Sequence, residues 1–249
     1  MRTGGTFASS RASKGRGTAE PQHPAMISAI LLSWKRSHNL PRIVDELARV
    51  PGISEILLWN NNPDIQLRLP KVTVIQSGRN FGCLARYCLV PLAANDTIWF
   101  QDDDLLVPAG QFEAIRPAYE ADPSRIYGIA GRNIVNGLYS ADTVYGECDI
   151  VLGQAMLFHR KLQAPAFEPF AALPPEMGED DIVFSLASPR RPCAIEIRTV
   201  DLGQGDDVAL WRRPDHFARR QQAVDFMAGR RTPASRGWER PASTEKSRE

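Results

Sequence analysis

Four short apolar runs, separated by two helical patterns, constrain the fold of this chain more than any other feature. The runs cover 26–32, 53–59, 72–75 and 97–101. Helical spacing of apolar residues separates the first run from the second, and a helical pattern over 84–93 separates the third from the fourth. This alternation is typical of a buried sheet with helices on both faces. We therefore expect an α/β fold with a mostly parallel or mixed central sheet.

A cluster of polar residues follows each of these runs. Because the carboxyl ends of parallel strands meet at one edge of a sheet, where ligands of α/β proteins bind, the clusters should converge on one rim. Their convergence indicates a binding site more strongly than any one cluster does. The clusters are Ser33-Trp34-Lys35-Arg36, Asn60-Asn61-Asn62, Ser77-Gly78-Arg79-Asn80 and Asp102-Asp103-Asp104.

The second half of the chain is less regular. Strands are predicted over 126–130, 149–158 and 193–200, and the strand over 149–158 is expected near the centre of a mixed sheet. One helix is predicted to begin at the acidic stretch 178–181, and the last predicted helix covers 214–227.

Composition divides the chain into a globular body and two tails. Residues 25–228 are expected to form one domain, since hydrophobic residues make up 43% of the chain and suffice for a large core. Residues 1–24 are rich in Arg, Ser, Gly and Thr and are expected to be a disordered extension, as is the tail 229–249. The first segment lacks the apolar middle of a signal peptide, which predicts a cytoplasmic protein, with an organelle transit peptide as the alternative.

Bulk charge and cysteine spacing argue against several kinds of site. With a formal net charge of +1, the chain has no general attraction for nucleic acid or membrane surfaces. No apolar run approaches the roughly 18 residues of a transmembrane segment. None of the 4 cysteines forms a CxxC pair, which argues against zinc. An acidic ligand would therefore have to be recognised locally.

The triplet Asp102-Asp103-Asp104 follows the buried run 97–101 directly. Adjacent carboxylates repel one another, so a sequence does not gather them at a strand end for stability. A hard cation such as Mg²⁺ or Mn²⁺ offsets the repulsion, because both take oxygen ligands, and a diphosphate supplies further oxygens. A solvated acidic turn is the alternative, but the position after a buried strand favours a metal site.

A second acidic stretch, Gly178-Glu179-Asp180-Asp181, begins a predicted helix. One carboxylate there is expected to cap the helix, because free N–H groups and the helix dipole favour a negative charge. Capping needs fewer carboxylates than the stretch contains. We therefore predict a catalytic role for Asp180 or Asp181 as a general base or acceptor-binding group.

Cations and amides complete the predicted rim. Guanidinium groups suit phosphate oxygens, and asparagines suit a base or ribose, although both are also common on surfaces and in turns. Glycine permits close backbone approach, and Arg219, with His216, lies where a C-terminal helix would close over a diphosphate. The candidate ligand-binding residues are Ser33, Arg36, Asn60, Asn61, Arg79, Asn80, Arg86, Asp102, Asp103, Gly153 and Arg219.

Taken together, these motifs resemble glycosyltransferases of the GT-A fold, the fold of nucleotide-diphospho-sugar transferases. The pattern is closest to the exostosin-like family 64 transferases and more loosely similar to family 2, and it covers about residues 26 to 225. The order of the motifs carries the resemblance: Ser33-Trp34-Lys35-Arg36, Ile56-Leu57-Leu58-Trp59-Asn60-Asn61, Arg79-Asn80-Phe81-Gly82, Trp99-Phe100-Gln101-Asp102-Asp103-Asp104, Val151-Leu152-Gly153-Gln154-Ala155 and Gly178-Glu179-Asp180-Asp181-Ile182.

The resemblance implies a metal-dependent hexosyl- or N-acetylhexosaminyltransferase with a UDP-sugar donor and Mn²⁺, or Mg²⁺. Asp104 would bind the metal, with Asp102 as a further ligand, and Asp102 or Asp103 would contact ribose or the sugar. Asn60 would lie near uracil, and Arg36 and Arg86 near base or phosphate. Family 64 transferases retain configuration and family 2 transferases invert it; Glu-Asp-Asp is compatible with both.

Two alternatives use the same scaffold. A metal-dependent nucleotidyltransferase should have a Gly-rich loop after its first strand, whereas this chain has Ser33-Trp34-Lys35-Arg36. A non-catalytic nucleotide-sugar-binding module cannot be distinguished by fold alone. The presence of both acidic groups favours an enzyme over such a module.

Overall fold

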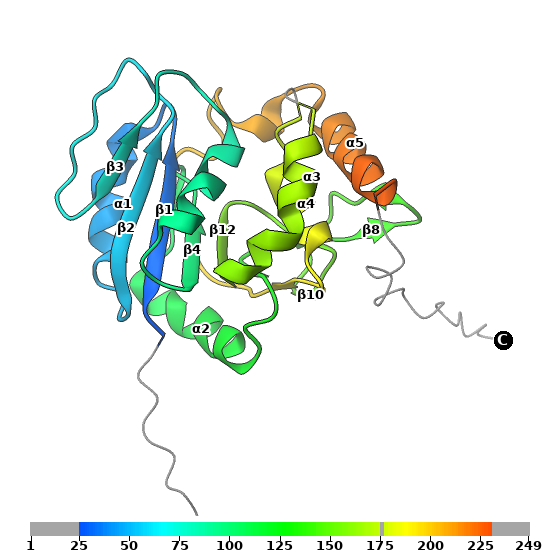
Figure 1. Ribbon diagram of the computed structural model, residues 1–249, viewed down its shortest axis with the longest axis horizontal. Coiled ribbons are helices and arrows are strands. Elements are labelled where there is room, and N and C mark those ends of the chain that lie inside the picture. The colour runs from blue at the N-terminus through cyan, green and yellow to red at the C-terminus, as the bar shows by residue number, and fades with distance from the viewer. Residues whose placement is uncertain (1–24, 175–176, 231–249) are drawn as a thin grey trace, which may run out of the picture.

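The computed structural model describes residues 25–174 and 177–230, which contain an eight-stranded sheet with helices on both faces (Figure 1). The tails predicted over 1–24 and 229–249 lie outside the described residues, apart from Gly229 and Arg230. Across the two described ranges, no helix is both long and apolar enough to cross a membrane.

The sheet has the strand order β10-β13-β6-β12-β4-β1-β2-β3, and its last four strands are parallel to one another. β12 is antiparallel to both β4 and β6, β13 is parallel to β6, and β10 is antiparallel to β13. The predicted mixed sheet, with a strand from the second half near its centre, is confirmed. The strands are β1 (Ile27–Ser33), β2 (Ile53–Asn60), β3 (Thr73–Gln76), β4 (Thr97–Gln101), β6 (Tyr127–Gly128), β10 (Gly146–Glu147), β12 (Ala155–His159) and β13 (Cys193–Ala194).

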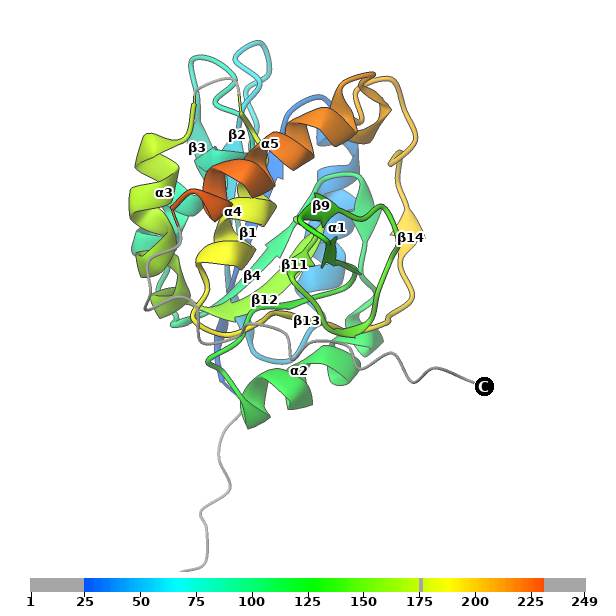
Figure 2. The ribbon, with the colours of Figure 1, turned by 90° about the vertical axis from the view of Figure 1, so that its right-hand side faces the viewer.

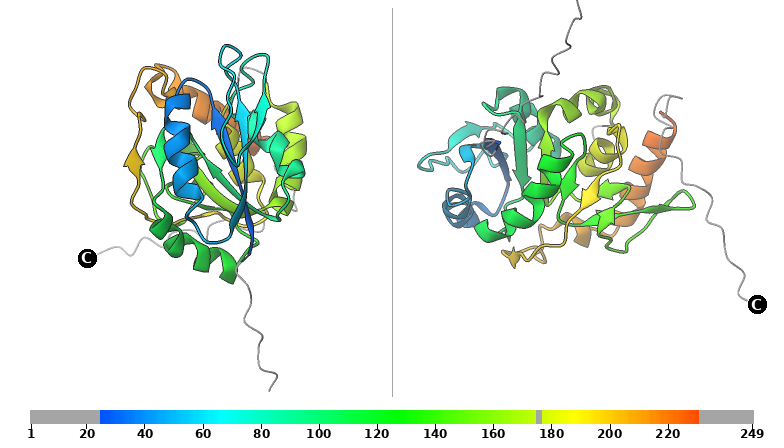
Figure 3. Two further views of the ribbon diagram at one scale, coloured as in Figure 1. Left: turned by 90° about the vertical axis from the view of Figure 1, so that its left-hand side faces the viewer. Right: turned by 90° about the horizontal axis from the view of Figure 1, so that it is seen from below.

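Both faces of the sheet are buried, which explains why the first runs are apolar at nearly every position. Successive side chains of a strand point to opposite faces. In β1, Leu31 therefore packs in the core cluster that holds α1 (Leu40–Leu47) and α2 (Phe112–Ala121). Its neighbour Ile30 packs in the cluster of the 3-10 helix η2 (Cys83–Leu92). Figure 3 shows α1 on one side of the sheet and η2 with α3 on the other.

A third core cluster joins α4 (Asp180–Ala187) to the C-terminal helix α5 (His216–Ala228). Figure 2 shows α5 lying across α4. The helices that complete the fold are α3 (Phe167–Ala172) and the short 3-10 helices η1 (Ser37–Asn39), η3 (Ala109–Gln111), η4 (Arg160–Ala166) and η5 (Leu210–Arg212).

Three small antiparallel pairs extend from the sheet. One of them brings the segment after residue 199 against the chain that follows the three aspartates, because β14 pairs with β5. The pairs are β5 (Leu105–Leu106) with β14 (Val200–Asp201), β7 (Gly131–Arg132) with β11 (Ile150–Val151), and β8 (Ile134–Val135) with β9 (Leu138–Tyr139).

Three predicted elements differ from the structure. The segment 84–93 is a 3-10 helix with Pro91 inside it, and proline cannot donate a helical hydrogen bond. The single strand predicted over 149–158 is wrong, since a turn at 152–154 divides it into β11 and β12. The strand predicted over 193–200 is also wrong, because only its two ends pair, as β13 and β14.

Candidate active site

The three motif aspartates (Asp102, Asp103 and Asp104) follow β4 at the carboxyl end of the parallel strands. The Asp102 N–H donates to a carbonyl of the turn before β12 at 2.9 Å. On the opposite side, Asn39 Nδ2 donates to the Asp103 and Leu202 carbonyls, each at 2.8 Å. The motif is thus fixed between β12 and the segment that follows β14.

Arg36, in the loop after β1, places its positively charged guanidinium close to two motif aspartates. Its Nη1 lies 3.5 Å from an Asp103 oxygen and 3.3 Å from an Asp104 oxygen. Its Nε and Nη2 donate to the two oxygens of Asp206, at 2.7 and 2.6 Å. The carboxylate repulsion that we expected a metal ion to offset is therefore partly offset by an arginine.

Asp104 keeps one carboxylate oxygen without a protein partner among the described residues. Its Oδ1 is buried and makes no hydrogen bond, whereas its Oδ2 faces Arg36. Burial raises the pKa of Asp104 to about 6, despite the opposing charge of Arg36. An unpaired carboxylate oxygen fits a hard divalent cation, so the chemistry of this residue agrees with its predicted role.

The protein offers few further metal ligands. Within 25–174 and 177–230, no group of three or more His, Cys, Asp and Glu side chains is arranged to hold a metal ion. Asp102 has a side chain that is 32% exposed and is therefore the motif aspartate most accessible to a ligand. Cations such as Mg²⁺ are commonly bound through one or two carboxylates, with water and substrate phosphates completing the shell.

Arg86 joins Asp102 to Asp180, the first of the two helix aspartates (Asp180 and Asp181) that begin α4. The residue lies in η2 and is only 2% exposed. Its Nη1 donates to Asp102 at 2.9 Å, and its Nε and Nη2 both donate to Oδ2 of Asp180, at 3.1 and 2.6 Å. A buried cation requires such partners. These contacts are internal, in contrast to the base or phosphate contact expected from the sequence.

Gly153 provides the space that Arg86 occupies. The Gly153 carbonyl accepts from Arg86 Nη1 at 2.9 Å, and its N–H donates to Asp181 at 3.2 Å. A Cβ at this position would lie 2.5 Å from Arg86 Nη2. The absence of a side chain is therefore needed for the bridging arginine, and the close approach predicted for this glycine involves the protein itself.

Both oxygens of Asp181 are used inside the fold. Oδ2 accepts from Arg220 Nη2 at 2.8 Å as well as from Gly153, and Oδ1 accepts from the Ile182 N–H at 2.8 Å. Burial would raise the pKa of Asp181, but Arg220 and these hydrogen bonds bring the pKa below its ordinary value. Asp181 therefore remains charged and anchored between α5 and the turn before β12.

Asp180 differs because both of its hydrogen bonds to Arg86 fall on the same oxygen, Oδ2. Burial raises the pKa of Asp180 in spite of the Arg86 charge. Of the two predicted catalytic residues, Asp180 is thus the one whose second oxygen is not held by Arg86. Glu179 stands at the N-cap without a capping hydrogen bond from its side chain and instead pairs with Arg219 at 3.0 Å.

The predicted asparagines that follow β2 form hydrogen bonds with neighbouring loops at the rim. Asn60 is fully buried, and its Nδ2 donates to the Ile65 carbonyl and to Gln76, both at 2.7 Å. Asn61 is also buried and donates to the Gly82 carbonyl at 3.0 Å. Their geometry favours a loop-positioning role over the predicted contact with base or ribose.

The three remaining residues predicted at the rim differ in their exposure to solvent. Ser33 is buried at the end of β1. Arg79 is exposed, with its guanidinium 4.5 Å from the centre of the Phe81 ring. Asn80 is exposed and closes its own turn by accepting from the Gly82 N–H at 2.8 Å. Of these three, Arg79 and Asn80 are open to a ligand.

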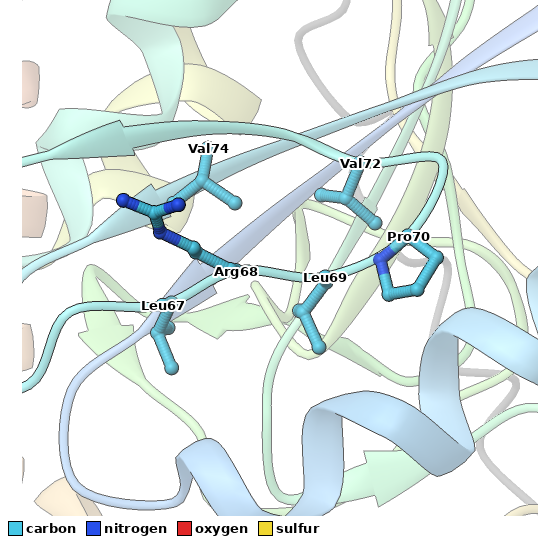
Figure 4. A pocket seen from close by; sticks show the side chains of 6 residues that line it. All are labelled: Leu67, Arg68, Leu69, Pro70, Val72 and Val74. Atoms are coloured by element: carbon cyan, nitrogen blue, oxygen red, sulfur yellow. The ribbon is translucent and has the colours of Figure 1, made fainter.

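One cavity lies near the carboxyl ends of the parallel strands, and another lies at the edge of the sheet. A cavity of about 400 Å³ beside Arg36 is basic, and its lining residues are Trp34, Lys35, Asp207, Val208, Ala209, Arg212, Arg213 and Pro214. Figure 4 shows the other, of about 510 Å³, at the edge strand β3, where Arg68 is the one charged residue among its lining side chains. Only the basic cavity adjoins the motif aspartates, because the Trp34 N–H donates to Asp103 at 3.1 Å.

Sequence reasoning missed two residues that organise this site, Arg220 and Asp206. Arg220 shares its helical spacing with the buried Ala223, Val224 and Met227, and a charge on an apolar helix face signals a buried ion pair. No comparable signal exists for Asp206, whose pairing with Arg36 depends on the tertiary path of the segment after β14.

The fold is that of GT-A glycosyltransferases. It resembles the mannosyltransferase PcManGT from Pyrobaculum calidifontis, solved with GDP-Man and Mn²⁺, with a TM-score of 0.56 and 14% identity over 90% of this chain and 68% of that one. It also resembles GalNAc-T7, solved with UDP, GalNAc and Mn²⁺, with a TM-score of 0.53 and 10% identity over 70% of this chain and 43% of that one. At these identities the likeness concerns the fold.

Residues 27–230 match the glycosyl transferase family 64 domain, and the chain belongs to this family. The predicted resemblance to family 64 is therefore confirmed. A comparison with curated proteins gave no significant match. S. aureus TarS is a further structural neighbour, with a TM-score of 0.50 and 13% identity over 82% of this chain and 71% of the solved fragment.

Replacing Gly153 with alanine is expected to displace Arg86 and to destabilise the fold by about 2–4 kcal/mol, because the new methyl group would overlap a buried ion pair. Chemical denaturation measures the change. Gly110→Ala is the matched control, since its Cβ would lie more than 4 Å from every described residue other than Gly110 and its two chain neighbours. Equal stability of the two variants would contradict the proposed packing of Arg86.

Replacing Asp104 with asparagine is expected to stabilise the metal-free protein at pH 8 by about 2 kcal/mol. The folded pKa of about 6 exceeds the ordinary value of 3.8, so the folded state binds the proton more tightly than the unfolded state does. The stability gained from protonating Asp104 in the folded state is present below about pH 4 and is lost as the pH rises through about 6. Denaturation in EDTA at pH 4 and pH 8 tests this, and a variant less stable than the wild type at pH 8 would contradict it.

Proposed function

We propose that this family 64 glycosyltransferase transfers a hexosyl or N-acetylhexosaminyl group from a nucleotide-diphosphate sugar, preferably a UDP-sugar, to an acceptor hydroxyl with the aid of Mn²⁺ or Mg²⁺. The observation that carries the proposal is the buried Oδ1 of Asp104, which has no hydrogen-bond partner in the part of the chain that the structure describes. The adjacent Asp102 is linked through Arg86 to Asp180, so a metal ligand and a candidate catalytic carboxylate belong to one connected cluster. Residues 25–228 are proposed to act as a single catalytic domain.

Asp104, with Asp102 as the neighbouring ligand, would hold the divalent cation. When bound, the cation would screen the negative charge that develops on the leaving diphosphate. Two structural neighbours, PcManGT and GalNAc-T7, were solved with Mn²⁺ and with GDP-Man or UDP, which supports a metal and a nucleotide sugar on this fold. The choice of UDP rests on membership of family 64.

The cations of the rim divide into two groups by their position, one against the motif and helix aspartates and one along the basic cavity. Arg36 and Arg86 are engaged with carboxylates and are proposed to position those groups. Lys35, Arg212 and Arg213 line the basic cavity and are proposed to attract the donor diphosphate. Phosphate recognition would thus be local, as the near-neutral net charge of the chain requires.

Asp180 is proposed as the catalytic carboxylate. Arg86 holds one of its oxygens and thereby fixes the direction of the other. In an inverting reaction that second oxygen would take the proton of the acceptor hydroxyl, and in a retaining reaction it would face the reacting carbon. Asp181 is proposed to have a structural role, because Arg220 and two backbone N–H groups use its oxygens.

Replacing Asp104 with alanine is expected to weaken UDP binding in the presence of Mn²⁺ by at least about tenfold, since the metal would lose its main protein ligand. Isothermal titration calorimetry with UDP, with and without Mn²⁺, measures the loss. Asp64→Ala, which removes an exposed carboxylate from the loop after β2, is the control. Unchanged Mn²⁺-dependent affinity in the Asp104 variant would refute the metal assignment.

Replacing Asp180 with asparagine is expected to lower kcat by roughly 10²–10⁴-fold while donor affinity stays within a few fold. Donor hydrolysis over a panel of nucleotide sugars provides the assay, and it also identifies the donor. Asp181→Asn is the comparison variant and should mainly reduce stability, because its ion pair with Arg220 is buried. Equal loss of kcat and donor affinity in Asp180→Asn would reassign that residue to binding, and donor binding by the wild type without any turnover would indicate a non-catalytic module.

A further inference from the structure

The guanidinium of Arg36 is shared unequally between two sets of carboxylates. Towards Asp206 it makes two parallel hydrogen bonds, of 2.7 and 2.6 Å. Towards Asp104 it offers only Nη1, at 3.3 Å. Bidentate pairing of arginine with a carboxylate is stronger and more directional than a single longer contact. The position of Arg36 is therefore determined mainly by Asp206.

Asp206 is itself held in the segment that follows β14. Its carboxylate accepts from the Val208 N–H at 3.0 Å, and its own N–H donates to the Gly203 carbonyl at 3.2 Å. The segment is tied to the motif aspartates, because the Leu202 N–H donates to the Asp104 carbonyl at 2.8 Å. Asp206 and Asp104 therefore use different nitrogens of Arg36, since Nε and Nη2 contact Asp206 and Nη1 faces Asp104.

Arg36 is also a potential competitor for the carboxylate that would bind the metal. Without Asp206, the two nitrogens that now face it would be free to pair with Asp103 and Asp104, which Nη1 already approaches. A guanidinium drawn closer to Asp104 would reduce the negative charge offered to a divalent cation and would repel that cation directly.

We propose that Asp206 is a positioning residue that holds Arg36 away from Asp104 and so keeps the Asp104 carboxylate available to a divalent cation. The inference rests on the metal site of the proposed function. In this role Asp206 acts through Arg36 and not as a general negative charge near the site.

A double-mutant cycle with Mn²⁺ alone as the probe separates these two modes of action. Mn²⁺ affinity is measured by calorimetry or by electron paramagnetic resonance for the wild type, Asp206→Asn, Arg36→Gln and the double variant. Asp206→Asn is expected to weaken Mn²⁺ binding about tenfold when Arg36 is present. In the Arg36→Gln background the same change is expected to have no effect, because the competitor is absent.

Two further variants control for charge and for folding. Asp64→Asn removes the same charge from an exposed residue in the loop after β2, away from the site, and is expected to leave Mn²⁺ affinity unchanged. Asp206→Glu keeps a carboxylate that can pair with Arg36 and is expected to restore most of the affinity. Thermal melting of each variant, compared with the wild type, shows that the measured affinities belong to folded protein.

The outcomes distinguish failure of this inference from failure of the proposed function. An equal loss of Mn²⁺ affinity from Asp206→Asn in both backgrounds, or no loss in either, would overturn the inference and leave the metal site intact. A wild-type protein that binds no Mn²⁺, alone or with UDP, would overturn both.

Discussion

Pairing between arginines and buried aspartates is the interaction on which the candidate site depends. Carboxylates removed from water must be paired, and here the partners come from three separate parts of the chain. Arg36 follows β1, Arg86 lies in η2 and Arg220 lies on α5. Together they connect the motif aspartates with the helix aspartates and bring the C-terminal helix into the site. Among the described residues, the network leaves one oxygen of Asp104 without a partner.

The sheet determines where this network forms. Strands buried on both faces require apolar side chains along their length, so polar residues are confined to their ends. β1 and β4 are parallel neighbours, which brings the loop that carries Arg36 next to the motif aspartates. The turn at Gly153 interrupts what would otherwise be one strand, and that interruption admits Arg86 to the space between β4 and α4.

The sequence predicted those parts of the fold that local patterns determine. The four parallel strands and the start of α4 were predictable from apolar runs and an acidic stretch, and so was the convergence of the clusters on one rim. The direction in which each polar side chain points could not be predicted, because it depends on partners that are distant in sequence. Arg86 and Asp180 are 94 residues apart, and Arg36 and Asp206 are 170 apart. Residues expected to face a ligand, such as Asn60, consequently proved to have internal partners.

We propose that Asp104 Oδ1, which has no hydrogen-bond partner among the described residues, accepts a divalent cation together with a nucleotide diphosphate. A crystal structure of the protein grown with Mn²⁺ and UDP tests this most directly, because manganese can be located by its anomalous scattering. We expect a manganese peak within bonding distance of Asp104 Oδ1, with UDP phosphate oxygens around the ion and Arg86 still joining Asp102 to Asp180. A manganese ion bound elsewhere, or bound UDP with no metal at Asp104, would contradict it.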